Sequence, residues 1–222
     1  MIKEKNKEII LSFDLDNTLI DNRDGIIASF NYALNKFSLP KLKNSEIEFM
    51  IGTPLDEMFA KVSKQEPSIL SSAFREYYGK IGIYQATLLP GIKAKLIELN
   101  KLNFTLGIIT SKKQEMAEKI ISYLDIDHFF NYIIGETEER KSLGKLDPKI
   151  KEILIKKYPN YKIIIIGDHP KDAMLSNNLN CPFIGVLTGT HTAEELKQIK
   201  TNKILIIDSV KELTINKINS LL

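Results

Sequence analysis

The sequence contains a single cysteine, Cys181, among its 222 residues. One cysteine excludes an internal disulfide and a zinc site built from several cysteines. Long apolar runs are also missing: even the longest all-aliphatic runs, such as Ile163–Ile166, are far short of the roughly 18–20 residues of a membrane span. The polar segment 1–8 and the short apolar run after it do not resemble a signal peptide. We therefore expect a cytoplasmic protein with no membrane partner.

Neither sign of charge dominates. The sequence has 31 Lys and Arg residues and 28 Asp and Glu residues, which gives a net charge of +3. The lysines are scattered, which is typical of solvated helix faces, so no nucleic-acid partner is predicted. A glycine-rich G-x-G-x-x-G segment after a strand is also absent, and this argues against a nucleotide-binding dehydrogenase. The length predicts one domain, or one domain that carries a sizeable insertion.

Short aliphatic runs recur along the chain, each closed by polar residues or glycine, and they predict strands. Their Ile and Leu content, without alternation, favours strands that are buried on both faces of a parallel sheet. Segments with helical period separate them, so the predicted class is α/β with helices on both faces of the sheet. The predicted strands are Ile9–Phe13, Phe104–Ile109, Tyr132–Ile134, Ile163–Ile166, Phe183–Leu187 and Ile204–Ile207.

One interval breaks this alternation, because about 90 residues without a convincing strand separate the first two predicted strands. An unstructured loop of that length is improbable in a compact domain. We therefore predict a helical domain over residues 21–88, inserted into a core formed by residues 1–20 and 89–222. Its predicted helices are Gly25–Phe37, Glu46–Met50, Leu55–Lys64 and Ser68–Lys80.

Two carboxylates, Asp14 and Asp16, directly follow the first predicted strand. In an open parallel sheet, ligands bind in the crevice beyond the carboxyl ends of the strands. Two acids at this spacing repel each other and stay ionised together only near a cation or other positive groups. An ordinary acidic turn is the competing interpretation of this pair taken alone.

Polar groups at later strand ends favour a site. Thr110 and Ser111 follow the second strand, where a hydroxyl and backbone N–H groups can hold a phosphate oxygen. Gly167-Asp168 follows a later strand, and Asp172 falls on the opening turn of the next predicted helix. Lys145 precedes a predicted helix start, with Asp147 as its cap and Pro148 at its first position.

The order of these motifs resembles the haloacid dehalogenase superfamily of phosphotransferases: D-x-D-x-T, a Thr or Ser after a strand, a lysine, then G-D-x-x-x-D. The resemblance covers nearly the whole chain. Asn22–Leu34 resembles the first helix of a small helical (C1-type) cap, and Leu89–Ile92 resembles the return to the core. Cys181–Val186 with Gly189 is similar to the segment after the last motif in phosphoglycolate phosphatase-like members. A Rossmann-like core with an inserted cap is the implied fold.

The resemblance implies that Asp14 is the nucleophile, which forms an aspartyl-phosphate, and that Asp16 is the general acid and then the general base. It also implies Mg²⁺ as the cofactor. The ion would be held by Asp14, by the backbone carbonyl of Asp16 and by Asp168, with Asp172 binding directly or through water. An all-oxygen site of this kind suits a hard octahedral cation.

Further residues are implied to contact the phosphate or the rest of the substrate. Thr110, the Ser111 N–H and Lys145 would hold the phosphoryl oxygens, and Thr18 would form a hydrogen bond near Asp16. The cap residues expected to face the substrate are Arg23 and Thr53. The residues expected to contact the phosphate or the rest of the substrate are therefore Thr18, Thr110, Ser111, Lys145, Arg23 and Thr53.

Departures from the family pattern bear on the reaction class. The dehalogenases of the superfamily lack an acid at the position of Asp16, so its presence argues for phosphate chemistry. A phosphonatase would place a lysine in the cap loop, which here reads Ile51-Gly52-Thr53-Pro54. Leu146 replaces a frequent proline and His169 a common small residue; we interpret His169 as an accessory or structural group.

The resemblance predicts a Mg²⁺-dependent phosphomonoester hydrolase, monomeric or homodimeric, that acts on a small phosphorylated metabolite. The alternatives are a phosphomutase of the β-phosphoglucomutase type, a pyrophosphatase, and a phosphate-sensing or binding module. Receiver domains, which represent the last class, are shorter and take their phosphoryl group on a later Asp.

Overall fold

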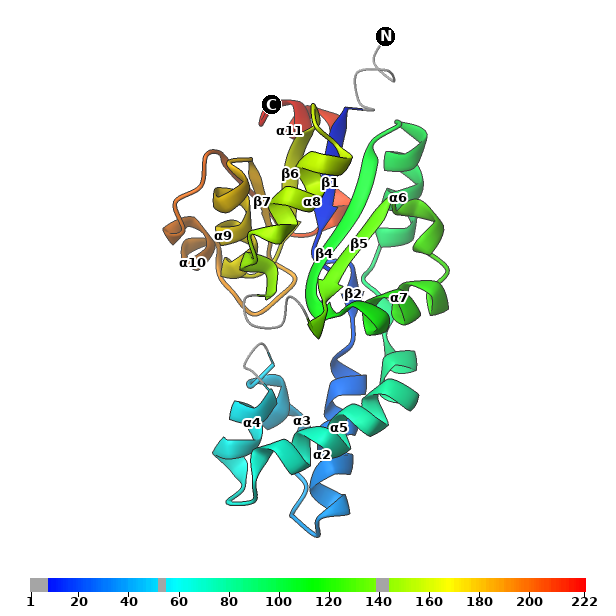
Figure 1. The fold of residues 1–222 in the computed structure, drawn as a ribbon, viewed down its shortest axis with the longest axis vertical. Coiled ribbons are helices and arrows are strands. Elements are labelled where there is room, and N and C mark those ends of the chain that lie inside the picture. Colours follow the sequence, from blue (N-terminus) through cyan, green and yellow to red (C-terminus); the bar gives the residue numbers. More distant parts are fainter. Residues whose placement is uncertain (1–7, 52–54, 139–143) are drawn as a thin grey trace. The chain divides into compact units, whose positions relative to one another are not determined.

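The computed structural model describes residues 8–51, 55–138 and 144–222. The chain divides into two compact units, one formed by Met1–Asp21 with Leu88–Leu222 and the other by Asn22–Thr87. Figure 1 shows the ribbon and labels its main elements. In chain order the elements are β1 (Ile9–Phe13), β2 (Ile20–Asp21), α2 (Arg23–Lys36), α3 (Asn44–Glu48), α4 (Leu55–Val62), α5 (Pro67–Lys80), η1 (Gly82–Gln85), β3 (Thr87–Leu88), α6 (Ile92–Lys101), β4 (Thr105–Lys113), α7 (Gln114–Tyr123), η2 (Asp127–Phe129), β5 (Tyr132–Glu136), η4 (Gly144–Leu146), α8 (Lys149–Lys157), β6 (Lys162–Gly167), α9 (Pro170–Leu179), β7 (Phe183–Val186), α10 (Ala193–Gln198), β8 (Ile204–Ile207), η5 (Val210–Glu212) and α11 (Ile215–Asn219).

The larger unit, which we call the core, is built on a six-stranded sheet with the order β5-β4-β1-β6-β7-β8. All five neighbouring pairs are parallel. Strand β1 lies in the middle, with Phe13 opposite Ile108 of β4 and Ile166 of β6. The carboxyl ends of β1, β4 and β6 therefore meet at one edge of the sheet. The predicted α/β class with a mainly parallel sheet is confirmed.

Aliphatic side chains of neighbouring strands meet on one face of the sheet, where helices α8, α9 and α10 cover them. Ile109 lies opposite Ile134 across β4 and β5, and Ile165 lies opposite Phe183 across β6 and β7. Burial of such side chains stabilises the fold by roughly 1.5–3 kcal/mol each. The buried members of this cluster are Ile109, Ile134, Ile150, Leu154, Ile165, Ala173, Leu175, Cys181, Phe183 and Leu196.

Helix starts near the site depend on short polar segments. Thr192 and Glu195 form the expected capping box at the start of α10. Helix α8 differs from the prediction, because it begins at Lys149 and Pro148 occupies the N-cap position. Asp147 still satisfies a backbone donor of the first turn, since its Oδ1 accepts a hydrogen bond from the Lys149 N–H at 2.9 Å.

The smaller unit is helical, and α2 packs on α3 and α5 while α4 packs on α5. Its centre contains a stacked aromatic pair, Phe30 and Phe59, whose ring centroids lie 4.2 Å apart. Close approach of α2 and η1 requires two glycines. A Cβ on Gly25 would lie 2.1 Å from the Gly82 carbonyl oxygen, so a larger residue there would separate the two elements.

The observed elements extend the predicted ones in places. Strand β4 continues through Lys113, beyond the apolar run that predicted it, because polar residues add to its carboxyl end. The two-residue strands β2 and β3 pair with each other where the chain leaves and re-enters the core. Neither was predicted, since two residues carry no detectable alternation.

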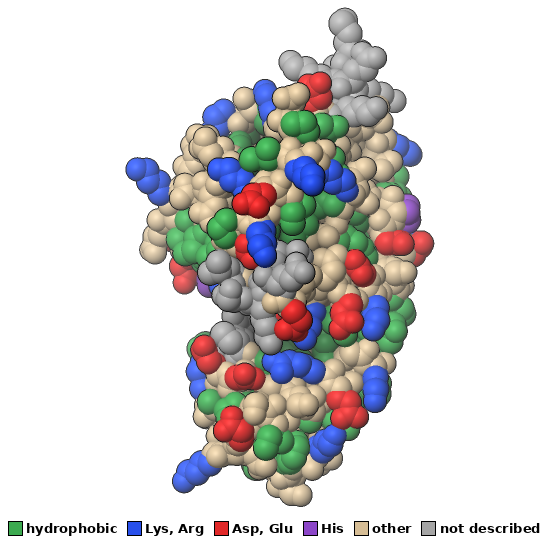
Figure 2. Space-filling view, viewed as in Figure 1, with side chains coloured by type: hydrophobic (Ala, Val, Ile, Leu, Met, Phe, Trp, Pro, Cys, Tyr) green, Lys and Arg blue, Asp and Glu red, His purple; other side chains and the backbone are tan. Residues whose placement is uncertain are grey.

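Acidic and basic side chains are mixed across the face drawn in Figure 2. This agrees with the near balance of 31 basic and 28 acidic residues in the sequence. Among the described helices, none combines the length and the apolar character that a membrane crossing requires.

Candidate active site

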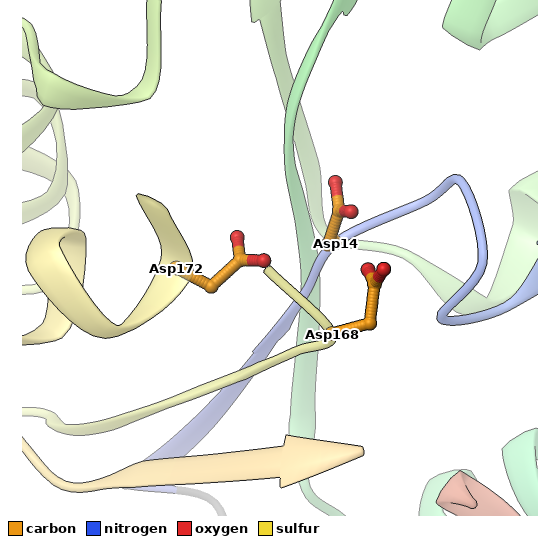
Figure 3. Close-up of side chains that lie close together, drawn as sticks. All are labelled: Asp14, Asp168 and Asp172. Atoms are coloured by element: carbon orange, nitrogen blue, oxygen red, sulfur yellow. The ribbon is translucent and has the colours of Figure 1, made fainter. Parts of the chain in front are cut away.

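Three buried carboxylates converge at the carboxyl edge of the sheet. Asp14 follows β1, Asp168 follows β6, and Asp172 lies on the first turn of α9. One oxygen from each of the three lies within 4.8 Å of the others. Figure 3 shows the three side chains together, with Asp172 reaching from its helix toward the other two. Asp14 is held against β6, because its N–H donates to the Ile166 carbonyl at 2.8 Å.

Lys145 enters this cluster from η4. Its Nζ lies 2.6 Å from Oδ1 of Asp14 and 2.6 Å from Oδ1 of Asp172. The lysine side chain is 4% exposed, so both ion pairs are shielded from water. Burial acts to lower the pKa of Lys145, but the charges of Asp14 and Asp172 outweigh it and hold that pKa above its ordinary value. Lys145 is therefore a permanent cation of the site.

The remaining negative charge is not compensated by this lysine. Burial, followed by the charges of Asp14 and Asp172, raises the pKa of Asp168 to about 8. Burial also raises the pKa of Asp172 to about 6, although Lys145 acts in the opposite direction. Three carboxylates against one lysine leave a site whose ionised form requires further positive charge.

Two glycines give the carboxylates their positions. A Cβ on Gly189, which follows β7, would lie 1.9 Å from Oδ2 of Asp168. A Cβ on Gly167 would lie 2.3 Å from the Asp172 carboxyl group. Any larger residue at either place would displace an acid of the cluster. The sequence resemblance included Gly189, but the reason for the glycine becomes visible only in the structure.

Thr18 is fully buried, and its hydroxyl donates to Oδ1 of Asp168 at 3.1 Å. We expected this hydrogen bond near Asp16, so the observed partner is different. The turn that follows Asp14 explains why the Thr18 side chain points toward Asp168. Asn17 adopts a left-handed backbone conformation with φ 56°, and the N–H groups of Thr18 and Leu19 return to the Leu15 carbonyl.

His169 caps helix α9. Its Nδ1 accepts a hydrogen bond from the Lys171 N–H at 3.0 Å, and its own backbone N–H donates to Oδ2 of Asp172 at 3.2 Å. This reciprocal capping box fixes the carboxylate of Asp172. Burial, together with the neighbouring His191, lowers the pKa of His169 to about 4, so its ring is neutral near pH 7. The interpretation of His169 as a structural residue stays a prediction, and these contacts support it.

The end of β4 brings a second lysine to the site. Thr110 is buried and Ser111 is exposed, both directly beyond Ile109. Lys112 then reaches Asp16, with its Nζ 3.1 Å from Oδ2. The surroundings of Asp16 raise its pKa through desolvation, with Lys112 acting to lower it and Asp14 acting to raise it. Lys112 was not predicted as a site residue. The signal was its spacing, because a residue two positions after Thr110 lies on the same side of an extended strand.

Two sequence-predicted site residues belong to the helical unit and not to the core. Arg23 is exposed at the first residue of α2. Thr53 lies outside the described residues. Their contact with substrate stays a prediction.

The donor set fits a divalent cation with a preference for oxygen. Asp14, Asp168 and Asp172 supply carboxylate oxygens only, and burial, followed by their mutual repulsion, raises the pKa values of Asp168 and Asp172. A cation between them would relieve this repulsion. Among the described residues, no other group of three acids, histidines or cysteines is close enough to form a comparable site.

Comparison with known proteins agrees with this geometry. Residues 10–186 match the model of the haloacid dehalogenase-like hydrolase family. A protein of Caldanaerobacter subterraneus named as a candidate pyrophosphatase, PpaX, is 27% identical over 85% of this chain and 86% of its own length. Phosphoglycolate phosphatase of Vibrio cholerae is 25% identical over 84% of this chain and 88% of its own.

Solved structures show the same architecture. A haloacid dehalogenase-like hydrolase of Streptococcus pneumoniae superimposes with a TM-score of 0.77 at 28% identity, covering 89% of this chain and 93% of the other. The Rossmann-like fold and the acids at its strand ends are those of a hydrolase that transfers phosphoryl groups. The chain belongs to the haloacid dehalogenase-like hydrolase family, and it is a phosphatase. The resemblance drawn from the sequence is thereby confirmed.

Proposed function

We propose that this protein is a Mg²⁺-dependent phosphomonoester hydrolase that acts on a small phosphorylated metabolite through an aspartyl-phosphate. The observation that carries the proposal is the contact of Lys145 with Asp14 inside the buried acid cluster, 2.6 Å between Nζ and Oδ1. The Asp14 carboxyl group lies at the carboxyl end of β1, next to a cation that can bind the anion it attacks. The names of the similar pyrophosphatase and phosphoglycolate phosphatase support the same reaction class.

In the first step, a carboxylate oxygen of Asp14 attacks phosphorus. The bond between phosphorus and the ester oxygen breaks, and the proton of Asp16 passes to that oxygen as it leaves. Desolvation raises the pKa of Asp16, which is the direction that proton donation needs, while the charge of Lys112 acts in the opposite direction. The products are the alcohol and a phosphorylated Asp14.

In the second step, water attacks the phosphorus of the intermediate. The ionised Asp16 takes a proton from that water, and the bond between phosphorus and the Asp14 oxygen breaks. Inorganic phosphate leaves, and both aspartates return to their starting states. A phosphomutase would transfer the same phosphoryl group to a sugar hydroxyl in place of water.

Positive charge and donors surround the position of the phosphoryl group. Lys145, the Thr110 hydroxyl and the Ser111 N–H are the proposed contacts of its oxygens. Asp14, Asp168, Asp172 and the backbone carbonyl of Asp16 are the proposed ligands of Mg²⁺. When bound, this ion would neutralise the negative charge of the phosphoryl group and of the carboxylates.

Phosphate release from a panel of small phosphate esters and pyrophosphate tests this function. We expect turnover with Mg²⁺, loss of turnover with EDTA, and loss of turnover in Asp14→Asn. Rapid acid quenching with ³²P-labelled substrate should recover protein-bound phosphate from the wild type and none from Asp14→Asn. No release from any ester by a folded protein that binds Mg²⁺ would overturn the proposal. Transfer of label to a sugar phosphate in place of water would identify a phosphomutase.

A further inference from the structure

Lys112 is a second lysine in the core part of the site, and it contacts a different acid from Lys145. Its Nζ lies 3.1 Å from Oδ2 of Asp16, and its side chain is only 11% exposed. Lys145 instead contacts Asp14 and Asp172. The two lysines thus divide the site, one beside the nucleophile and one beside the residue proposed as general acid.

The backbone at the end of β4 directs Lys112 toward Asp16. Pairing between β4 and β5 is regular up to Ile109, shifts its register, and resumes only at Lys113. Within this irregular segment, the Lys112 N–H donates to the Thr110 hydroxyl oxygen at 3.2 Å. This bond ties the lysine to a residue proposed to bind phosphate. This main-chain bond, the contact of Nζ with Asp16 and the low exposure of the side chain together hold Lys112 within the site.

Chemistry places the leaving group near Lys112. A general acid must lie within hydrogen-bond distance of the oxygen that it protonates, about 2.6–3.2 Å. The Lys112 ammonium group lies 3.1 Å from Oδ2 of Asp16, so a leaving oxygen bonded to that same Oδ2 lies within about 6 Å of it. This reach includes the first few atoms of the leaving group.

We propose that Lys112 is a specificity-determining residue that selects substrates whose leaving group carries a second anion, a carboxylate or a phosphate, close to the ester oxygen. The inference rests on the proposed function. An ammonium group can donate three hydrogen bonds, so it can bridge the Asp16 carboxyl group and an anion of the leaving group. Charge-assisted bonds of this kind are stronger than neutral ones, and an uncharged leaving group does not form them.

The test compares kcat/KM of the full chain with Mg²⁺ for three probes: 2-phosphoglycolate, pyrophosphate and ethyl phosphate. The first two have anionic leaving groups and the third has a neutral one. We expect the wild type to prefer at least one anionic probe over ethyl phosphate by tenfold or more. The preference between carboxylate and phosphate shows which anion the site takes.

Lys112→Met should reduce the ratio of anionic to neutral kcat/KM by roughly 10- to 100-fold, the range expected for loss of one charged hydrogen bond. Lys112→Arg should keep most of the ratio. The matched control is Lys113→Met, which removes the exposed neighbouring lysine and should leave the ratio at the wild-type value.

An equal decrease for all three probes in Lys112→Met would overturn the inference, because Lys112 would then serve only to position Asp16. A wild type that hydrolyses ethyl phosphate as well as both anionic probes would also overturn it, and this measurement needs no variant to fold. In either case the proposed phosphatase function would stand. If the protein hydrolyses other esters of the panel but neither anionic probe, the inference alone is overturned.

Discussion

The ammonium nitrogen of Lys145 lies 2.6 Å from Oδ1 of Asp14. The two residues are 131 positions apart in the sequence. They meet because Asp14 follows the central strand β1, while η4, which carries Lys145, packs against β4, β5 and α9. The same nitrogen contacts Asp172 at 2.6 Å. One buried cation thus stabilises two of the three clustered acids, and its removal would leave buried negative charge without a partner.

Lys145→Met is expected to destabilise the fold in the absence of metal. Removing one partner from a buried ion pair generally costs about 3–5 kcal/mol, because the remaining charge is neither solvated nor paired. Urea unfolding in EDTA measures the difference, and phosphate release should fall in the same variant. Lys149→Met is the control, since Lys149 is exposed on the first turn of α8. Equal unfolding midpoints for the two variants would contradict the assigned ion pairs.

Asp16→Asn should separate the two chemical steps. A p-nitrophenolate leaving group needs little protonation, so the variant should still release about one equivalent of p-nitrophenol from p-nitrophenyl phosphate. Steady-state turnover should fall about 10²- to 10⁴-fold, because the base for the attacking water is missing. Stopped-flow absorbance detects the burst. A variant with full steady-state activity would show that Asp16 is not the acid and base.

Much of this site was predictable from the sequence because its members directly follow apolar runs. Asp14, Thr110 and Asp168 each come immediately after an apolar run that predicts a strand, and parallel strands bring such positions to one edge. The direction of a side chain was less predictable. Thr18 donates to Asp168 because the turn after β1 is closed by the left-handed Asn17, a tertiary detail that no spacing encodes.

Lys112 shows a second limit of sequence reasoning. The apolar run ends at Ile109, so the strand appeared to end there, yet β4 continues to Lys113 through an irregular register. A lysine after a strand is ordinarily a solvated charge. Only the contact with Asp16 distinguishes Lys112 from the exposed Lys113 beside it.

Stability of the metal-free protein is expected to decrease as pH rises from about 4 to 8. The pKa of Asp168 is raised to about 8 and that of Asp172 to about 6, so the folded state binds more protons than the unfolded chain in this window. Each carboxyl group protonated only in the folded state contributes a slope of about 1.4 kcal/mol per pH unit. Thermal unfolding in EDTA at pH 5, 6, 7 and 8 measures the trend.

The control for this pH dependence is Asp168→Asn, which should flatten the upper part of the decrease because the group with the higher pKa is removed. Added Mg²⁺ should stabilise the wild type more at pH 8 than at pH 5, since the ion competes with protons for the carboxylates. Stability that stays level or rises between pH 5 and 8 in EDTA would show that the cluster is ionised throughout.

Gly189→Ala should weaken metal binding without changing any proposed ligand. The new methyl group would lie 1.9 Å from Oδ2 of Asp168, so the carboxylate must move from the position that Thr18 and the neighbouring acids define. We expect the dissociation constant for Mg²⁺ to rise about tenfold, equivalent to roughly 1.4 kcal/mol, and isothermal titration calorimetry measures it. Thr190→Ala, at an exposed position one residue later, should bind Mg²⁺ like the wild type. A wild-type dissociation constant in Gly189→Ala would mean that the displacement of Asp168 does not matter to the ion, and Asp168 would then lose its proposed place among the ligands.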